Sequence, residues 1–202
     1  MKSSLWNRLA GMYDRTFTPV LNRDLKIIFE LGRFKLGDAV LDYGGGTGRV
    51  AAAIKNRVAR AVVADAAPRM VARAMAKGLE AVRVTGLPAP FPDASFNTIL
   101  VIEAFHHMPD HEAHLKEFHR LLKPGGKLIL EEPDPRFWWT RVALWIERCF
   151  ESITPHTPEA MASLLERHVQ SRIRVDNPNS PRQRRLHLRK CRSWRRDYDP
   201  VH

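Results

Sequence analysis

The segment VLDYGGGTGRV, at residues 40–50, constrains the fold of this 202-residue chain more than any other part of it. An apolar run leads into Asp42 and is followed by four glycines within five positions. Glycines allow backbone conformations with positive φ and let a ligand approach the main chain closely. A strand, a glycine-rich turn and a helix, in this order, are the layout of a nucleotide-binding site in an open α/β sheet.

Strand-length apolar runs alternate with helical patterns along most of the chain. The runs predict strands at 39–43, 61–65, 80–84, 97–103 and 127–132, and helices at 49–57, 68–77 and 111–122. This order is typical of an α/β fold in which helices cover both faces of a parallel sheet. We therefore predict a Rossmann-like, doubly wound and mostly parallel sheet flanked by helices.

The composition divides the chain into three parts. Residues 1–35 hold two amphipathic segments, which we expect to form a helical cap over the ligand end of the sheet. Residues 36–168 are predicted to form the ligand-binding domain, which closes with a Trp-rich helical pattern and a helix that begins near Pro158. Residues 169–202 form a basic tail of atypical composition.

The net charge of +11 belongs mainly to the tail. Residues 167–202 hold eleven Lys or Arg against three Asp or Glu, an excess of +8. Three explanations compete: a basic arm that binds nucleic acid or an anionic membrane, a poorly ordered terminus, or the product of a shifted reading frame. We favour the last two together, in which case the sheet would lose its edge strands. The pieces SRIRVD and RRLHLRK could still pair as a degraded C-terminal hairpin.

No apolar stretch is long enough to span a bilayer, and the first residues lack the apolar core of a signal peptide. We therefore expect a soluble, cytoplasmic protein. Cys149 and Cys191 lie far apart in the chain and outside any CxxC pattern, which argues against a disulfide framework or a zinc site.

Two acids at strand ends indicate the kind of ligand. Asp42 would repel a pyrophosphate, so it favours a ligand with a cationic part. Asp65 lies 17 residues beyond Gly48, at the end of the next strand, where a carboxylate can accept both hydroxyls of a ribose. An adenosine-like ligand that carries positive charge is expected, and S-adenosylmethionine fits this description better than NAD.

Four motifs in this order resemble the class I S-adenosylmethionine-dependent methyltransferases: VLDYGGGTGRV, VVADAAPRM, LPAPFPDASFNTILVIEAFHHM and LLKPGGKLILEEPD. Within that family the pattern is most similar to the small-molecule group that includes the ubiquinone and menaquinone biosynthesis C-methyltransferases. The opening WNRLAGMYD resembles the start of that group, and the resemblance covers residues 5–168.

The resemblance implies a set of cofactor-binding residues. These are Asp42, Gly44, Gly45, Gly46, Gly48, Asp65, Ala66, Met70, Thr85, Gly86, Leu87 and Glu103. Asp42 and the glycine backbone would hold the methionine moiety, and Asp65 would hold the ribose. The family usually has an acid that reaches the adenine amino group where this chain has Thr85 and Gly86, so the backbone of Gly86 or Leu87 would have to serve instead.

The same resemblance implies catalysis mainly by positioning, because the cofactor supplies the reactivity. His106 and His107 follow the fourth predicted strand, and one of them could take a proton from the acceptor; the alternative is that the pair only caps the loop. Tyr13, His107 and Trp138 are the candidate acceptor contacts. The Trp-rich segment 137–150 could line an acceptor pocket, lie on a membrane surface, or pack on the sheet.

Four histidines crowd the segment from His107 to His119, at positions 107, 111, 114 and 119. Pro109 and Asp110 indicate a loop within this segment, and no cysteine supports the group, so we expect no metal site. Glu131 and Glu132, at the end of the fifth predicted strand, could face the acceptor or simply solvate the edge of the sheet.

The function predicted from sequence is methyl transfer from S-adenosylmethionine to a small, apolar or aromatic acceptor. One alternative is an inactive S-adenosylmethionine-binding protein with a damaged C-terminus. Another is a nucleic-acid methyltransferase, although EAFHH stands where such enzymes have an NPPY-type motif. The expected partner is therefore a small molecule and not a nucleic acid, with peripheral membrane contact left open.

Overall fold

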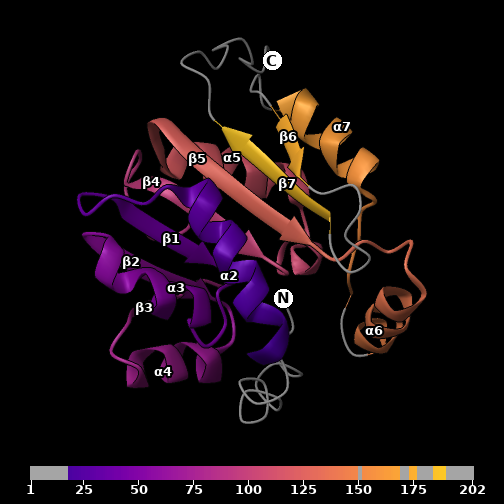
Figure 1. Cartoon of the computed structure of the whole chain (residues 1–202), viewed down its shortest axis with the longest axis horizontal. Coiled ribbons are helices and arrows are strands. Elements are labelled where there is room, and N and C mark those ends of the chain that lie inside the picture. The colour runs from indigo at the N-terminus through magenta and orange to yellow at the C-terminus, as the bar shows by residue number, and fades with distance from the viewer. Residues whose placement is uncertain (1–17, 150–151, 169–172, 177–183, 190–202) are drawn as a thin grey trace.

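The computed structural model of the chain describes residues 18–149, 152–168, 173–176 and 184–189. Within these ranges it contains a mixed sheet whose strands lie in the order β3-β2-β1-β4-β5-β7-β6 (Figure 1). The strands are β1 (Ala39–Tyr43), β2 (Arg60–Asp65), β3 (Glu80–Arg83), β4 (Phe96–Ile102), β5 (Leu122–Glu132), β6 (Ile173–Asp176) and β7 (Arg184–Arg189). The first five strands pair in parallel, whereas β7 runs antiparallel to both β5 and β6.

Side chains cap the first turn of two of the described helices. The helices are α2 (Thr18–Gly32), α3 (Arg49–Ile54) with the 3-10 turn η1 (Lys55–Arg57), α4 (Pro68–Ala76), the 3-10 turn η2 (Phe105–His107), α5 (His111–Leu121), α6 (Trp138–Arg148) and α7 (Pro158–His168). At the start of α5, the Asp110 carboxylate accepts a hydrogen bond from the Ala113 N–H (2.9 Å). At the start of α7, the Thr157 hydroxyl accepts one from the Ala160 N–H (3.3 Å). Each cap pairs a donor that the first helical turn leaves open.

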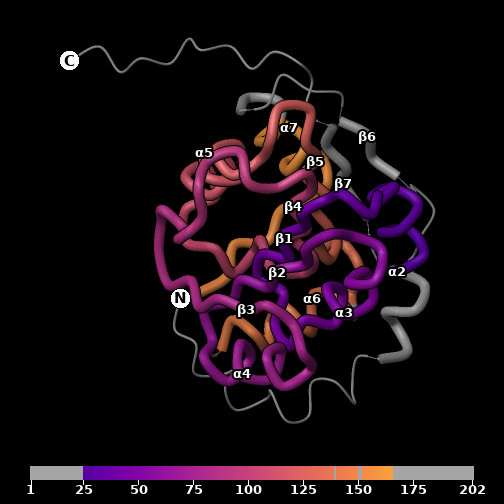
Figure 2. Tube along the Cα trace, turned by 90° about the vertical axis from the view of Figure 1, so that its left-hand side faces the viewer, coloured from indigo at the N-terminus to yellow at the C-terminus, as the bar shows by residue number. Residues whose placement is uncertain are grey.

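Helices cover both faces of the sheet. Successive residues of a strand point to opposite faces, so each apolar strand contributes side chains to two cores. On one face, Leu100 of β4 shares an apolar core with Ile28 of α2 and Ile54 of α3. On the other face, the neighbouring Ile99 shares a core with Phe118 of α5 and with residues of α7. Figure 2 shows α5 and α7 on one side of the strands and α2 and α3 on the other.

The place of β1 in the sheet determines where a ligand can bind. β1 lies between β2 and β4, so the chain first winds outward to β3 and then crosses back to β4. At such a reversal the loops that follow neighbouring strands diverge and leave a crevice at the carboxyl edge of the sheet. The predicted doubly wound fold is confirmed, with each of the five predicted strands within a few residues of its expected range except the start of β5.

β5 begins five residues earlier than predicted. Leu122 already pairs with Phe96 of β4, and after a shift in register Lys127 pairs with Thr98. The segment LKPGG therefore forms an irregular first part of β5 and is not only a turn. Gly125 lies within this irregularity with φ of 75°.

A shifted reading frame was expected to leave the sheet without its edge strands, and the structure contradicts that consequence. The alternative, in which SRIRVD and RRLHLRK pair as a C-terminal hairpin, is confirmed. β6 and β7 form the antiparallel hairpin, and β7 pairs with β5 along six residues, with Leu186 opposite Leu130 and Leu188 opposite Leu128. Strand pairing depends on backbone hydrogen bonds, so a strand rich in arginine can still complete a sheet. The rest of the tail, from residue 190 onward, lies outside the described residues.

The predicted N-terminal cap is described only in its second half. α2 packs on the face of the sheet beside α3. The Lys127 ammonium donates a hydrogen bond to the carbonyl of Gly32, the last residue of α2. Residues 1–17 lie outside the described residues, so a cap over the ligand end stays a prediction. Across the described ranges, no helix is both long and apolar enough to cross a membrane.

Candidate active site

The glycine-rich turn after β1 holds the backbone close to neighbouring segments. The Gly44 N–H donates to the Ala64 carbonyl of β2 (2.7 Å), which ties the turn to the sheet. Gly44, Gly46 and Gly48 have φ of 74°, 57° and 73°, values that residues with a side chain rarely adopt. A Cβ atom on Gly44 would lie 2.5 Å from the Cβ of Ala104, in the loop after β4. A side chain at Gly44 would therefore not fit.

The other glycines of the turn serve two different purposes. A Cβ on Gly45 would meet the Asp42 carboxylate at 2.5 Å, and one on Gly48 would meet a methyl carbon of Leu79 at 2.4 Å. A Cβ on Gly46 would meet nothing nearer than the sulfur of Met70, at 4.0 Å. Gly46 therefore opens onto the cavity beside the turn, whereas Gly48 lets the turn pack against the layer beneath it.

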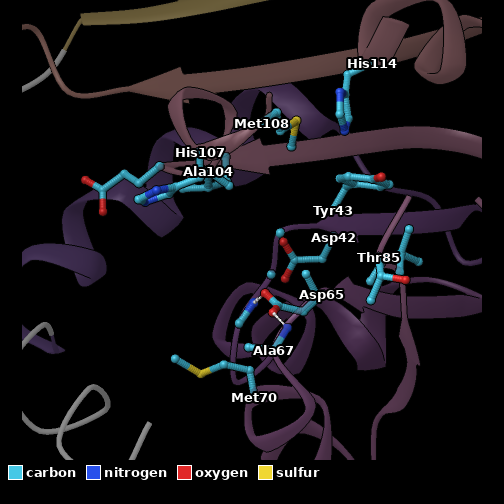
Figure 3. A pocket seen from close by; sticks show the side chains of 18 of the residues that line it. Asp42, Tyr43, Asp65, Ala67, Met70, Thr85, Ala104, His107, Met108 and His114 are labelled. Atoms are coloured by element: carbon cyan, nitrogen blue, oxygen red, sulfur yellow. Dashed lines mark hydrogen bonds between the residues drawn. The ribbon is translucent and has the colours of Figure 1, made fainter. Parts of the chain in front are cut away.

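Asp65, at the end of β2, is held by the backbone. Its two carboxylate oxygens accept hydrogen bonds from the Gly46 N–H (2.9 Å) and from the Ala67 N–H (2.8 Å), as the dashed lines in Figure 3 show. Burial raises the pKa of this carboxyl above its usual value, while the backbone N–H groups lower it. Each oxygen keeps a further lone pair, so the carboxylate can also accept the two hydroxyls of a ribose.

Asp42, near the end of β1, is almost completely buried at 2% exposure. The Ala51 N–H donates to its carboxylate (3.2 Å). Burial raises the pKa of Asp42 to about 7, and the charge of Asp65 adds to the shift. The two acids together make one wall of the site anionic. Burial of this charge costs free energy, and a cationic ligand would reduce that cost.

The acids and the turn border a cavity of about 230 Å³. Figure 3 shows Asp42, Asp65, Ala67 and Met70 on one side of it, Tyr43, Met108 and His114 on the other, and His107 and Thr85 at opposite ends. The side that faces the acids is therefore largely apolar and aromatic. The sequence does not single out this side, because Tyr43, Met108 and His114 are also ordinary residues for a protein core.

Most of the predicted cofactor residues come together at this cavity. Its lining includes Asp42, Gly44, Gly45, Gly46, Asp65, Ala66, Met70, Thr85, Gly86, Leu87 and Glu103. Gly48 lies beneath the turn and is not part of the lining. Thr85 and Gly86 do lie at the cavity.

The two predicted catalytic histidines, both in η2, differ in their surroundings. His107 lines the cavity, and burial together with the nearby charge of His106 lowers its pKa to about 4. His106 is buried, with Nδ1 2.5 Å from Glu132 and Nε2 3.3 Å from Glu147 of α6. Burial alone would lower the pKa of His106, but the two carboxylates outweigh it and raise the pKa to about 10. His106 is thus an imidazolium and His107 a neutral imidazole at pH 7.

Glu132, the last residue of β5, holds the loop that carries the histidines. Its carboxylate accepts hydrogen bonds from the backbone N–H groups of Ala104 (3.0 Å), Phe105 (2.7 Å) and His106 (3.2 Å), besides the His106 ring. His106 and the backbone N–H groups keep the pKa of Glu132 low although burial opposes this. Glu132 therefore neither faces the acceptor nor solvates the edge of the sheet, the two roles that the sequence left open. It positions η2 from inside the protein.

Glu103, between β4 and η2, has an unusual backbone conformation for a residue with a side chain. Its φ is 51°, and its N–H donates to the Glu131 carbonyl (2.7 Å). Such a conformation costs about 1–3 kcal/mol and persists where the surrounding structure enforces it, as it often does at functional sites. Glu103 also lines the cavity, whereas Arg33 and Ala94, the other described non-glycine residues with positive φ, do not.

The four histidines between residues 107 and 119 do not converge on one point in the way a metal site requires. His111 stacks on Phe105 and pairs with His156 (2.7 Å). Among the described residues, a different group does converge: His106, His107 and Glu147 offer ligand atoms within 4.8 Å of one another. Within this group, Nε2 of His106 lies 3.3 Å and Nε2 of His107 lies 4.0 Å from the Glu147 carboxylate.

Two predicted acceptor contacts are not placed at the cavity. Tyr13 lies outside the described residues. Trp138 lies on α6 with 71% of its surface exposed and is not part of the cavity lining. His107 is the predicted acceptor contact that the structure does bring to the cavity.

The residues present fit S-adenosylmethionine. The open side of Gly46 gives a backbone cradle without a side chain, and Asp65 lies next to it with its oxygens fixed. The raised pKa of Asp42 marks a buried carboxylate that the cationic ammonium or sulfonium group of this cofactor would stabilise. These two acids and the glycine turn would hold the cofactor.

The fold and this site define a class of protein, and comparison with known proteins agrees. A family model described as a methyltransferase domain matches residues 41–130. These matches confirm the resemblance to class I S-adenosylmethionine-dependent methyltransferases, and S-adenosylmethionine is the cofactor of that family. Within that class, the chain is similar to the enzymes of ubiquinone and menaquinone biosynthesis.

Two curated relatives carry this similarity. The demethylmenaquinone methyltransferase of Thermus thermophilus is 38% identical over 115 residues, which cover 52% of each chain. The ubiquinone/menaquinone biosynthesis C-methyltransferase UbiE of Stenotrophomonas maltophilia is 36% identical over 117 residues, which cover 52% of this chain and 46% of the relative. The chain thus spans about half the length of the curated relatives it matches. Neither an inactive binding protein nor a nucleic-acid methyltransferase is favoured by these matches.

Solved structures share the fold over a longer stretch. The DhpI–SAH complex has a TM-score of 0.71 at 20% identity and covers 94% of this chain and 95% of its own. A SAM-dependent methyltransferase from Archaeoglobus fulgidus has a TM-score of 0.70 at 15% identity and covers 89% of this chain and 98% of its own. At such low identity these structures show a common fold.

Proposed function

We propose that this chain transfers a methyl group from S-adenosylmethionine to a carbon atom of a small aromatic acceptor of the quinol type. The observation that carries the proposal is the cavity itself, which has the anionic wall of Asp42 and Asp65 on one side and an apolar, aromatic wall on the other. The curated relatives, which are named for demethylmenaquinone and for C-methylation, support the acceptor class.

The residues of the chain would divide the work of the reaction. When bound, S-adenosylmethionine supplies a methyl group on a sulfonium sulfur, which leaves as a neutral thioether. Asp42 and Asp65 bind and orient that cofactor, and the apolar wall excludes water from the reacting atoms. Methylation of an aromatic carbon forms one C–C bond and releases the proton of that carbon.

His107 is the residue we assign to the proton. It lines the cavity and is neutral at pH 7, so a ring nitrogen can accept a proton. His106 cannot take this role, because its two carboxylate partners keep it protonated. General bases contribute about 10²- to 10⁴-fold to a rate when their pKa lies near the working pH, so the lowered pKa of His107 places its contribution at the low end of that range.

The first experiment tests the cofactor site. Calorimetric titration of the full chain with S-adenosylmethionine and S-adenosylhomocysteine should show binding, and Asp65→Ala should weaken it by about 100-fold because two charge-assisted hydrogen bonds are lost. Asp93→Ala removes an exposed acid away from the cavity and should bind as the unaltered chain does. Equal binding by Asp65→Ala would refute the assignment of the cofactor site.

The second experiment tests the acceptor. Incubation with S-adenosylmethionine and a 1,4-naphthoquinol that lacks a ring methyl group should give a product with one added methyl group, detected by mass spectrometry. His107→Gln should lower kcat by at least about 100-fold and leave cofactor affinity unchanged. Cofactor binding without methylation of quinols would keep the cofactor site and reject the acceptor class.

A further inference from the structure

α6 exposes large apolar side chains on one side. Trp138, Val142, Trp145 and Ile146 are 71%, 49%, 66% and 48% exposed. At about 100° per residue, these four positions fall within a stripe roughly 100° wide along the helix. We call this stripe the outer face of α6. Exposed apolar side chains that lie singly are normal, but a contiguous patch marks an interaction surface.

The opposite side of α6 faces the protein. Thr140 and Leu144 are buried there, and Glu147 lies 3.3 Å from His106 and 4.0 Å from His107. These contacts fix the rotation of α6 about its axis. Because its inner side packs against the protein, its outer face is directed to solvent. Figure 1 shows α6 beyond the carboxyl end of β5. The cavity lies at the same edge of the sheet, because its lining residues follow the ends of β1, β2 and β4.

Elsewhere in the described residues, exposed large apolar side chains lie far apart in the chain. They are Leu36, Met75 and Leu87, each in a different segment. The clustering on α6 therefore does not follow from a generally apolar surface.

Basic side chains border the outer face. Arg141 and Arg148 are both exposed and lie seven residues apart, or about two turns, on the same flank of the helix. Tryptophan side chains on one face with arginine beside them are the pattern of a helix that lies in a membrane interface next to anionic headgroups.

We propose that the outer face of α6 docks onto the surface of an anionic lipid bilayer, with Trp138 and Trp145 inserted at the level of the headgroups. The helix has 11 residues and is about 16 Å long, which is too short to cross a hydrocarbon core of about 30 Å, so it lies on the surface. A second copy of the chain fits less well, because a stable protein interface takes about 20–30 residues on each side.

The docking surface lies directly behind the wall of the active site. Glu147, on the inner side of α6, contacts His107, which lines the cavity. A chain docked through α6 would thus hold its cavity close to the bilayer, where an apolar acceptor accumulates. The docking does not depend on methyl transfer, although it deepens the proposed function by giving the source of the acceptor.

Vesicle flotation tests the proposal with the full chain. Vesicles of phosphatidylcholine with phosphatidylglycerol should carry the protein upward in a density gradient, and vesicles of phosphatidylcholine alone should carry much less of it. The double variant Trp138→Glu/Trp145→Glu should partition at least about tenfold more weakly. The control Leu36→Glu/Met75→Glu changes two equally exposed apolar residues elsewhere and should float as the unaltered chain does.

The outcomes separate this surface from the basic tail and from other occupants. Equal flotation by the tryptophan variant and the unaltered chain would assign binding to the arginine-rich tail and overturn the proposal. Failure of the unaltered chain to float, or concentration-dependent dimerisation that the tryptophan variant abolishes without any vesicle binding, would also overturn it. Cofactor binding by the variant, measured by calorimetry, shows that it is folded and keeps this result distinct from a failure of the proposed function.

Discussion

The two halves of the carboxyl edge use buried carboxylates in opposite ways. On the β1–β2 half, backbone N–H groups hold the carboxylates of Asp42 and Asp65, which both border the cavity. On the β4–β5 half, Glu132 is also held by backbone N–H groups but is not part of the lining, and it grips His106 instead. Burial of an acid therefore does not define its role: one half presents charge to a ligand, and the other uses charge to position a loop.

The largest effect is expected from the positioning half. Glu132→Ala leaves Nδ1 of the His106 imidazolium and three backbone donors without their acceptor in the interior, so we expect a loss of about 3–5 kcal/mol in the free energy of unfolding. Urea denaturation measures the loss. Glu112→Ala, at an exposed position of α5, is the matched control and should change stability by less than about 0.5 kcal/mol.

The sign of the pH dependence offers a second check on the same variant. The folded state raises the pKa of His106 from 6.5 to about 10, so this ion pair stabilises the fold fully below pH 6.5 and loses its effect as the pH rises through about 10. The difference in stability between the unaltered chain and Glu132→Ala should therefore shrink toward pH 10. A difference that stays constant from pH 6 to pH 10 would show that the pair is not an ion pair.

The ligand half should respond in affinity rather than in stability. With its pKa near 7, Asp42 is protonated at pH 6 and charged at pH 8, so binding of the cationic cofactor should be about tenfold weaker at pH 6. In Asp42→Asn, binding should be weak at both values. Calorimetric titration at the two pH values measures this, and an unaltered pH dependence in Asp42→Asn would place the titrating group elsewhere.

Asp42→Asn should also make the protein more stable at pH 8. A raised pKa means that folding costs free energy wherever Asp42 is charged, and this cost grows between pH 3.8 and about 7. The asparagine avoids it and can still accept a hydrogen bond from the Ala51 N–H. A gain of roughly 1–3 kcal/mol at pH 8 that disappears near pH 4 is expected in urea denaturation.

A pair of glycines tests the glycine cradle with a smaller effect. Gly46 and Gly78 have φ of 57° and 71°, so replacement of either by alanine should cost about 1 kcal/mol of stability through backbone strain. The added Cβ would be open to the cavity at position 46 and would meet no atom within 4 Å at position 78. Gly46→Ala should weaken cofactor binding about tenfold, whereas Gly78→Ala should not; equal affinities would remove Gly46 from the site.

The smallest effect is expected at the opposite edge of the sheet. Arg60 and Glu80, the first residues of β2 and β3, form an ion pair whose side chains are each 45% exposed. Arg60→Ala should change stability by less than about 0.5 kcal/mol, because solvent screens such pairs. Urea denaturation of Arg60→Ala and Glu132→Ala compares an exposed ion pair with a buried one, and so separates the effect of burial from that of pairing. A loss in the free energy of unfolding for Arg60→Ala as large as that for Glu132→Ala would contradict this account.

The sequence predicts the ligand half well because local rules determine it. The period of two in the strands and the right-handed crossovers bring the ends of β1 and β2 together, and Asp42 and Asp65 stand at those ends. Positive φ at Gly44 and Gly46 follows from their place in a tight turn. Gly48 looked equivalent in sequence, but its environment depends on Leu79, which lies 31 residues away.

The positioning half could not be derived from sequence in the same way. Adjacent residues in a 3-10 turn point about 120° apart, so the sequence does not reveal whether His106 or His107 faces the cavity. Their charges depend on Glu132 and Glu147, which come from β5 and α6 and are brought there only by tertiary packing. The acceptor role predicted for Trp138 depended in the same way on the rotation of α6, which the inner contacts of that helix decide.

Glu147 gives α6 a further property. The carboxylate stands on the inner side of the same helical turn whose outer side carries Trp145 and Ile146. Docking at the outer face and the contacts of the two histidines therefore depend on the same helix. A coupling free energy between two such sites is the same in both directions. If a docked surface shifts α6 so that acceptor binding strengthens, a bound acceptor must strengthen the hold on that surface by the same factor.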